Sequence, residues 1–342
     1  MKQSDFLRKI IDTRVSKDQI KEMLDNGASP DEEAPFFKSV NGDDIFASPI
    51  IIASTYSKDR VQIDKIKLLL NYDINVNGVN DTGENILTSL INSEFSSSLN
   101  SEYRIHLEDF IYITEKLIEK GFNINNADRV STLIKAISTG RMDIAHYLWD
   151  NRERLNIDIE FKTQNDENAL YYLIDSAFYE EINEKDEAYL KFKKEREDLF
   201  FRLIKETKLF IVTPVKSFPA TYFIANFAKK DMARICERLK KEIDLDLNQK
   251  SAEGGNNIFN TLFDIINYEP EMYECFAGDV VKYLIDNNVD YNNKNENGKF
   301  PDITNVIKNN KDIAKIFINI EKQKINDNLS INEDHSIVKR RI

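Results

Sequence analysis

Apolar residues recur along the chain with a spacing that predicts a series of similar helices. Eight segments contain the same kind of apolar-rich stretch, and seven of them open with Asp; in one, Ile66, Leu69 and Leu70 stand two, five and six residues after Asp64. That spacing puts the apolar side chains on one helical face. The segments open at Asp18, Asp64, Tyr112, Asp143, Asp198, Asp231, Asp279 and Asp312. We expect the aspartates to cap these helices, because a carboxylate accepts hydrogen bonds from unpaired backbone N–H groups.

A shorter helix is predicted ahead of each of these segments. Its start is visible where a polar capping residue precedes an apolar run, as in Gly83–Leu87 and Gly255–Phe259. The residues suited to cap it are Ser48, Asn85, Asn168 and Asn257. Gly83 and Gly255 supply the preceding turn. The chain therefore reads as a repeated unit of turn, short helix, longer helix and an Asn-containing return.

This unit resembles the ankyrin repeat family. Leu68–Asn77 and Glu115–Asn125 are similar to that family's second helix and Gly-Ala-Asp-Val-Asn ending, and Gly27–Asp31 is another match. Of the family's Thr-Pro-Leu-His opening, only Ser-Pro-Ile at 48–50 comes close. The resemblance covers roughly residues 4–320. It implies stacked helix pairs, β-turn fingers that project from one edge, and a concave face that binds protein.

The predicted fold is all-α: an ankyrin-repeat α-solenoid of seven or eight helix-turn-helix repeats with inserted loops. The shortest steps between segment openings are 31 to 33 residues, close to the family period of about 33. Longer steps place insertions at 92–109, 176–197 and 267–278. We predict one solenoid over residues 1–322 and a flexible tail over 323–342, where the repeat pattern ends.

Charge and composition narrow the function. A net charge of −12 disfavours direct binding of nucleic acid or of an anionic membrane, since both need a basic surface. No apolar run approaches the ~20 residues of a membrane span, and residues 1–11 lack a signal-peptide core. The two Cys and three His residues lack metal-ligand spacing. We expect a cytoplasmic protein (in the host cytoplasm for a phage or secreted effector) without metal or cofactor, and the oligomeric state stays open.

The sequence carries no catalytic motif, so we predict a protein that is not an enzyme and has no catalytic residues. Cys236 falls in the same register as Leu69 and Leu284, which predicts core packing for its thiol. The alternative from another class is a hydrolase or transferase that uses a cleft between the inserted loops. Carboxylates are abundant enough to supply such a cleft.

The predicted fingers are acidic. Segments 31–47, 75–84, 123–130, 158–167, 246–256 and 290–299 hold 16 Asp or Glu and 6 Lys or Arg. Turn chemistry explains aspartates but not the glutamates, so an acidic binding edge and ordinary turn preference both remain open. In the first finger, Phe36, Phe37 and Phe46 lie between acidic clusters. They suit either an interface hot spot or a cover for the N-terminal end of the solenoid.

The sequence thus predicts a module that binds one specific, basic protein partner through acidic fingers and a concave face. We expect Glu84, Glu167 and Glu253 to be exposed. The candidate partner-binding residues are Phe36, Phe37, Phe46, Asp81, Glu84, Asp128, Ser138, Thr139, Glu167, Glu253 and Glu296. Degenerate repeats and an Asn-, Ile- and Lys-rich composition, common in AT-rich bacterial and phage genomes, favour an inhibitor. Such an inhibitor would be a toxin-immunity protein or an anti-defence or effector factor. A nucleic-acid mimic that occupies a basic groove is a further hypothesis within the binding class.

Overall fold

The chain forms two compact units. The computed structural model describes residues 2–38, 44–56, 60–80, 82–91, 105–127, 129–165, 167–174, 187–206, 232–243, 246–248, 250, 255, 257–268 and 277–339. These residues are mostly helical, with few strands. Unit 1 comprises Met1–Leu173 and Tyr179–Phe200, and unit 2 comprises Ile174–Phe178 and Phe201–Ile342. The single solenoid over residues 1–322 stays a prediction.

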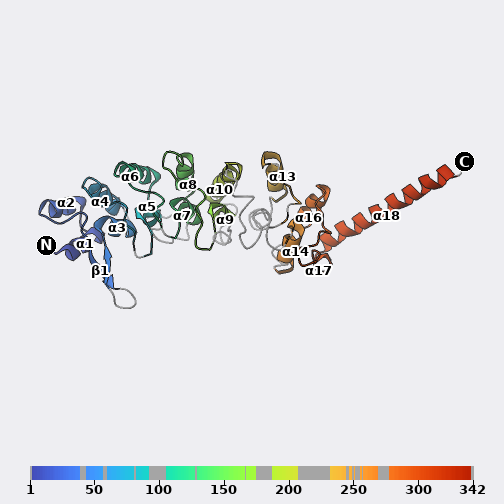
Figure 1. Cartoon of the computed structure of the whole chain (residues 1–342), viewed down its shortest axis with the longest axis horizontal. Coiled ribbons are helices and arrows are strands. Elements are labelled where there is room, and N and C mark those ends of the chain that lie inside the picture. Colours follow the sequence, from blue (N-terminus) through green and yellow to red (C-terminus); the bar gives the residue numbers. More distant parts are fainter. Residues whose placement is uncertain are drawn as a thin grey trace. The chain divides into compact units, whose positions relative to one another are not determined.

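The helices of unit 1 alternate between two rows. In chain order they are α1 (Gln3–Ile11), α2 (Lys17–Asp25), α3 (Pro49–Thr55), α4 (Arg60–Leu69), α5 (Ile86–Ile91), α6 (Leu107–Glu119), α7 (Thr132–Ser138) and α8 (Met142–Asp150). Helices α9 (Ala169–Ile174) and α10 (Glu187–Glu206) follow, and their last residues, Ile174 and Phe201–Glu206, belong to unit 2. Helices α1, α3, α5 and α7 pack successively on one another, and so do α2, α4, α6 and α8 (Figure 1). The described part of unit 1 therefore contains the predicted stacked helix pairs.

Unit 2 shows the same order of packing. Its described helices are α13 (Met232–Ile243), α14 (Ile258–Tyr268), α16 (Ala277–Asp286), α17 (Ile303–Asn309) and α18 (Lys311–Lys339). Helix α13 packs on α16 and α16 on α18, while α14 packs on α17. Helix α18 extends beyond α16 and α17 (Figure 1), so the backbone of 323–342 is helical as far as Lys339. The flexibility of this tail and the count of seven or eight repeats stay predictions.

Most opening aspartates lie inside the first turn of their helix and do not cap it. In α2 the N-cap is Ser16, whose Oγ accepts from the Gln19 N–H while the Gln19 side chain accepts from the Ser16 N–H. Asp18 then lies in the first turn, where its charge favours the positive end of the helix dipole. Asp64 and Asp198 are further from a start, because α4 begins at Arg60 and α10 at Glu187.

The predicted caps of the shorter helices are confirmed at three positions. Asn85 Oδ1 accepts from the Thr88 N–H at 2.9 Å, Asn168 Oδ1 from Tyr171 at 3.1 Å, and Asn257 Oδ1 from Asn260 at 3.1 Å. Ser48 differs: it is the N-cap residue of α3, but its Oγ is buried and makes no hydrogen bond in the described structure. Pro49 occupies the first helical position, where its ring fixes φ in the helical range and favours the start of α3 without that cap bond.

The all-α prediction needs one addition, because the first finger contains a β-hairpin. Strands β1 (Ala34–Lys38) and β2 (Asp44–Ala47) pair in antiparallel register, with Pro35 opposite Phe46 and an irregularity between Pro35 and Phe37. Strand β1 also packs on α1. The β-branched and aromatic residues of this finger favour an extended backbone, which a search for helical periodicity does not detect.

The same hydrogen-bonded motif, with a residue of positive φ, turns the chain toward the next finger after several of the longer helices. Gly27, Gly121 and Asn288 follow α2, α6 and α16, and Asn156 closes the turn that follows α8. After α6, for example, the Gly121 N–H donates to Ile118 O and the Phe122 N–H donates to Leu117 O. Glycine adopts this left-handed backbone without steric cost and asparagine at a small one. The Asn-containing return seen in the sequence starts from this turn.

An Asn and Asp ladder then joins successive returns. Asn77 Nδ2 donates to Gly121 O at 3.0 Å, and Asn77 Oδ1 accepts from the Asn123 N–H at 2.7 Å. Asn125 repeats the pattern with Asn156 O at 2.7 Å and the Asp158 N–H at 2.9 Å. In unit 2, Asn248 Oδ1 accepts from the Asp290 N–H at 2.8 Å. The ladder fixes each return against the next, and so sets where the fingers begin.

The core of unit 1 includes a buried cation. Every residue of α5 is buried, and so are Trp149 and Phe110, each large apolar side chain contributing roughly 1.5–3 kcal/mol. Lys65 is fully buried as well, and its Nζ donates to Ile10 O and Asp12 O at 2.8 Å and to Lys9 O at 3.4 Å. This lysine therefore supplies hydrogen bonds to the Lys9 and Ile10 carbonyls in the last turn of α1, and it adds a second donor to Asp12 O, which also accepts from the Val15 N–H. None of the described helices is long and apolar enough to cross a bilayer.

Candidate partner-binding surface

Three fingers contain the same five-residue turn. In the finger before α5, Asn80 Oδ1 accepts from the N–H groups of Thr82 and Glu84, and the Asn80 N–H donates to Glu84 O at 2.9 Å. Thr163 does the same for Asn165 and Glu167. In unit 2, Asn295 does so for Asn297 and Lys299. The fifth position thus holds Glu84, Glu167 or Lys299, and the turn fixes its backbone.

The sequence reasoning missed the first residue of this turn. Asn80, Thr163 and Asn295 each stand four positions before the fifth residue. An alignment of the fingers on Glu84 and Glu167 places an Asn or Thr four positions earlier in each. The signal is weak in a single finger, because Asn and Thr are common turn residues.

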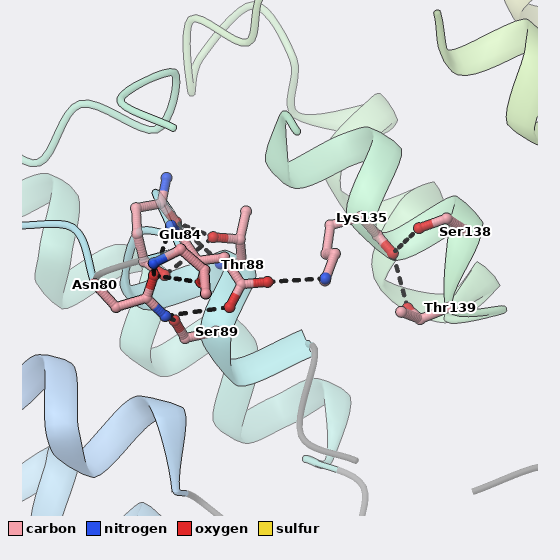
Figure 2. Close-up of polar contacts among 9 residues, drawn as sticks. Asn80, Glu84, Thr88, Ser89, Lys135, Ser138 and Thr139 are labelled. Carbon is pink, nitrogen blue, oxygen red and sulfur yellow. Dashed lines mark hydrogen bonds and ion pairs between the residues drawn. The ribbon is translucent and has the colours of Figure 1, made fainter. Parts of the chain in front are cut away.

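Glu84 forms the centre of a half-buried polar cluster that links two helix pairs. Its Oε1 accepts from Lys135 Nζ on α7 at 2.9 Å, and its Oε2 accepts from Asn80 Nδ2 at 3.2 Å (Figure 2). Asn80 Nδ2 also donates to Ser89 Oγ on α5 at 3.4 Å. The side chains of Glu84 and Lys135 are 18% and 16% exposed. The expectation that Glu84 is an exposed finger carboxylate is therefore wrong, because Lys135 neutralises it within the fold.

Ser138 and Thr139 lie at the end of α7, one turn beyond Lys135 (Figure 2). Ser138 Oγ donates to Lys135 O at 3.1 Å, and Thr139 Oγ1 donates to the same carbonyl at 2.8 Å. Both residues are half-buried. The structure thus gathers three predicted binding residues around Lys135: Glu84, Ser138 and Thr139.

Glu167 belongs to a second cluster, with different chemistry. Its Oε2 accepts from Tyr172 Oη at 2.8 Å and from Thr163 Oγ1 at 3.2 Å. Tyr172 and its neighbour Tyr171 are both on α9, and their rings meet edge to face with centroids 5.3 Å apart. Glu167 and both tyrosines are half-buried. Hydroxyl groups, not a cation, hold this carboxylate in the described structure.

The first finger presents an exposed apolar pair. Phe46 is 57% exposed, and Pro35, its partner across the hairpin, is also exposed. Phe36 and Phe37 belong to β1, and their side chains lie outside the described residues, as does that of Cys236. Glu32 and Glu33, just before β1, are exposed. Phe46 is thus an accessible aromatic residue close in sequence to negative charge.

The remaining candidates are not brought into these clusters. Glu296 is exposed and belongs to unit 2, where it lies against the backbone of Gly255. Asp81, Asp128 and Glu253 lie outside the described residues, as does most of each insertion. The hypothetical cleft between inserted loops therefore stays a hypothesis. Among the described residues, no group of His, Cys, Asp or Glu is arranged to hold a metal ion.

Turn chemistry accounts for several finger aspartates. Asp31 Oδ1 accepts from the Asn75 N–H at 2.7 Å, so it continues the ladder at the first finger. Asp158 and Asp290 accept from the N–H two residues further on, at 3.0 and 2.8 Å. The exposed glutamates Glu32, Glu33 and Glu160 are not explained in this way. Turn preference therefore accounts for these aspartates, and an acidic binding edge stays a prediction for the exposed glutamates.

Comparison with known proteins finds similarity to solved structures. No protein-family model and no curated protein matches the chain. Among solved structures, it is similar to the human ASB11 ankyrin repeat domain, at 14% sequence identity and a TM-score of 0.45. The similarity covers 75% of this chain and 90% of that chain.

Proposed function

We propose that the chain is an ankyrin-type module that binds another protein. The observation that carries the proposal is the pair of polar clusters around Glu84 and Glu167 in unit 1. Both clusters are built on a finger turn and the short helix that follows it, which is anchored by packing of α5 on α3 and α7 and by the buried Leu170 and Leu173 of α9, so their side chains are held in fixed positions. Half-buried polar and aromatic groups on a rigid scaffold suit recognition of a protein surface, because little side-chain entropy is lost on binding.

The partner, in this proposal, is one specific protein with a basic surface, and binding inhibits it. The exposed glutamates of the fingers support a basic partner, since complementary charge steers association. The exposed Phe46 offers an anchor of the kind found at interface hot spots. The irregular insertions, which make the repeats unlike one another, support a surface adapted to a single partner.

Affinity capture from the source organism's lysate, followed by titration with the purified partner, tests this function. Ser138→Arg places a bulky cation on the half-buried end of α7, whereas Glu119→Arg places it on the exposed face of α6. We expect the Ser138→Arg variant to lose the partner and the Glu119→Arg variant to retain it. An activity assay of the captured partner, with and without the chain, tests inhibition. If wild type retains no specific protein, or both variants bind equally, the proposed surface is wrong.

A further inference from the structure

The two finger glutamates of unit 1 stand at equivalent positions but differ in what neutralises them. Glu84 receives a cation from the next helix pair, because Lys135 Nζ lies 2.9 Å from its Oε1. For Glu167, the described part of the chain supplies only the Thr163 and Tyr172 hydroxyls, both at Oε2. Its Oε1 accepts no hydrogen bond among the described residues and is not buried. One carboxylate oxygen of Glu167 is thus available to a donor from outside.

The sequence of the following repeat agrees with this difference. Lys135 stands eight residues before Asp143, which opens the next longer helix. The residue eight before Asp231, the corresponding opening one repeat later, is Phe223. The lysine that serves Glu84 therefore has no counterpart in sequence for Glu167.

The surroundings of Glu167 favour a basic side chain over other ligands. A half-buried carboxylate bonds most strongly to a charged donor. Tyr172 bonds to it through its hydroxyl and meets the ring of Tyr171 edge to face, and a cation within about 6 Å of an aromatic face is attracted by the ring quadrupole. Tyr172 also fixes the carboxylate through its hydroxyl, so the two elements of the site are held together.

We propose that Glu167, Tyr171 and Tyr172 form a seat for an arginine or lysine side chain of the protein partner. The inference rests on the proposed function and specifies the chemistry of its contact. The partner residue takes the place that Lys135 holds at Glu84: its cationic group donates to Glu167 Oε1 while its stem lies along the tyrosine rings. A single basic residue then provides a contact specific to the repeat that contains α9.

Small probes test the seat without the partner. The full chain, labelled with ¹³C at the tyrosine rings, is titrated with N-acetyl-arginine methylamide and with the neutral N-acetyl-citrulline methylamide. Tyr171→Phe and Tyr172→Phe variants assign the two signals by their loss. We expect the arginine probe to shift both signals in a saturable way, with a dissociation constant of about 1–10 mM. The citrulline probe, which lacks the charge, should leave them unchanged.

Glu167→Gln is the decisive variant, because glutamine can still accept from Thr163 and Tyr172 and keeps the turn. We expect it to weaken the arginine probe by about fivefold or more. Glu160→Gln removes the same charge from an exposed finger position and should leave the titration unchanged. An equal response to both probes, no shift up to about 20 mM, or an unaltered titration of Glu167→Gln would overturn the seat. If the chain captures a protein but does not bind the arginine probe, the seat is wrong and the proposed function stands. If the chain binds the probe but captures no protein, the proposed function is wrong and the basic-side-chain site itself stands.

Discussion

Backbone conformation at single residues decides how each helix pair leads into the next finger. Gly121 has φ +80°, and a Cβ built there would meet no other atom within 4 Å. The cost of a side chain at this position is therefore one of backbone strain and not of crowding. Asn156 and Asn288 occupy the same conformation with a side chain present. Every described residue with a positive φ is therefore either a glycine or an asparagine.

Gly121→Ala should destabilise the chain by about 1–2 kcal/mol, the cost of a left-handed backbone for a residue with a Cβ. Gly78→Ala is the matched control. Gly78 does not have a positive φ, and its Cβ would meet Ile51 Cγ1 at 3.6 Å, an ordinary contact. Urea denaturation should show a lower midpoint for Gly121→Ala and little change for Gly78→Ala. Equal midpoints for the two variants would contradict the strain argument.

Between elements, side-chain amides and ion pairs join neighbouring helix pairs. Each ladder asparagine donates to a carbonyl of the next return and accepts from an N–H of that same return, so it satisfies two backbone groups that the loop does not pair within itself. In the turn after α8, Arg154 makes two hydrogen bonds of 2.7 Å to Glu115 on α6. Tyr147 on α8 adds a third at 2.9 Å. These links fix the spacing of the rows beyond what apolar packing alone provides.

Asn125→Ala should cost about 0.5–1.5 kcal/mol, because it removes the amide partner of the Asn156 carbonyl and of the Asp158 N–H, both of which water can still reach. Asn165→Ala, at an exposed finger position, should change stability by less than about 0.5 kcal/mol. Hydrogen exchange gives the sharper measurement. The Asp158 amide should exchange faster in Asn125→Ala than in wild type, and unchanged exchange would show that the ladder bond carries no stability.

The Glu115 ion pair predicts a dependence on acid. The hydrogen bond from Arg154 lowers the pKa of Glu115 below its ordinary value of 4.5, burial opposes this, and the Tyr147 hydroxyl adds to the lowering. Because the pKa is lower in the folded state, the stabilisation is complete above pH 4.5 and is lost as the pH falls through the folded-state value. Glu115 is 38% exposed, so we expect only a few tenths of a kcal/mol.

Urea denaturation between about pH 3 and pH 7 checks this window. Wild type should exceed Glu115→Gln in stability near neutral pH, and the difference should vanish in acid. Glu153→Gln is the control, since that carboxylate is 91% exposed and 3.9 Å from Arg152. A difference between wild type and Glu115→Gln that persists at the lowest pH would contradict the ion-pair explanation.

For the whole molecule, the contacts that define each unit lie within that unit. We therefore expect denaturation in two steps, which would count against a single cooperative solenoid over residues 1–322. The chain has one tryptophan, Trp149, which is fully buried in unit 1. Its fluorescence should report the unfolding of unit 1, while circular dichroism at 222 nm reports helices of both units. Coincident transitions would contradict the two-step expectation and favour the single solenoid.

A Lys65→Met substitution tests whether the tryptophan transition reports the stability of unit 1. It removes the Lys65 donor from the buried Ile10 O, while Asp12 O keeps the Val15 N–H, and this should lower the stability of unit 1 by about 1–3 kcal/mol. The tryptophan transition should shift accordingly. Lys315→Met removes an exposed lysine of α18 in unit 2 and should leave that transition in place. A tryptophan transition insensitive to Lys65→Met would mean that the buried ammonium does not stabilise α1.

The sequence alone determined the helices and their pairing, because apolar spacing and capping asparagines are local properties. Asn85, Asn168 and Asn257 could be assigned as caps for that reason. The tertiary structure alone decided which charges face which partners. Lys135 lies 51 positions from Glu84, and no local pattern indicates that it neutralises one finger glutamate while the other keeps only hydroxyl partners. Contacts between distant residues depend on how the helix pairs stack, and stacking is a property of the folded chain.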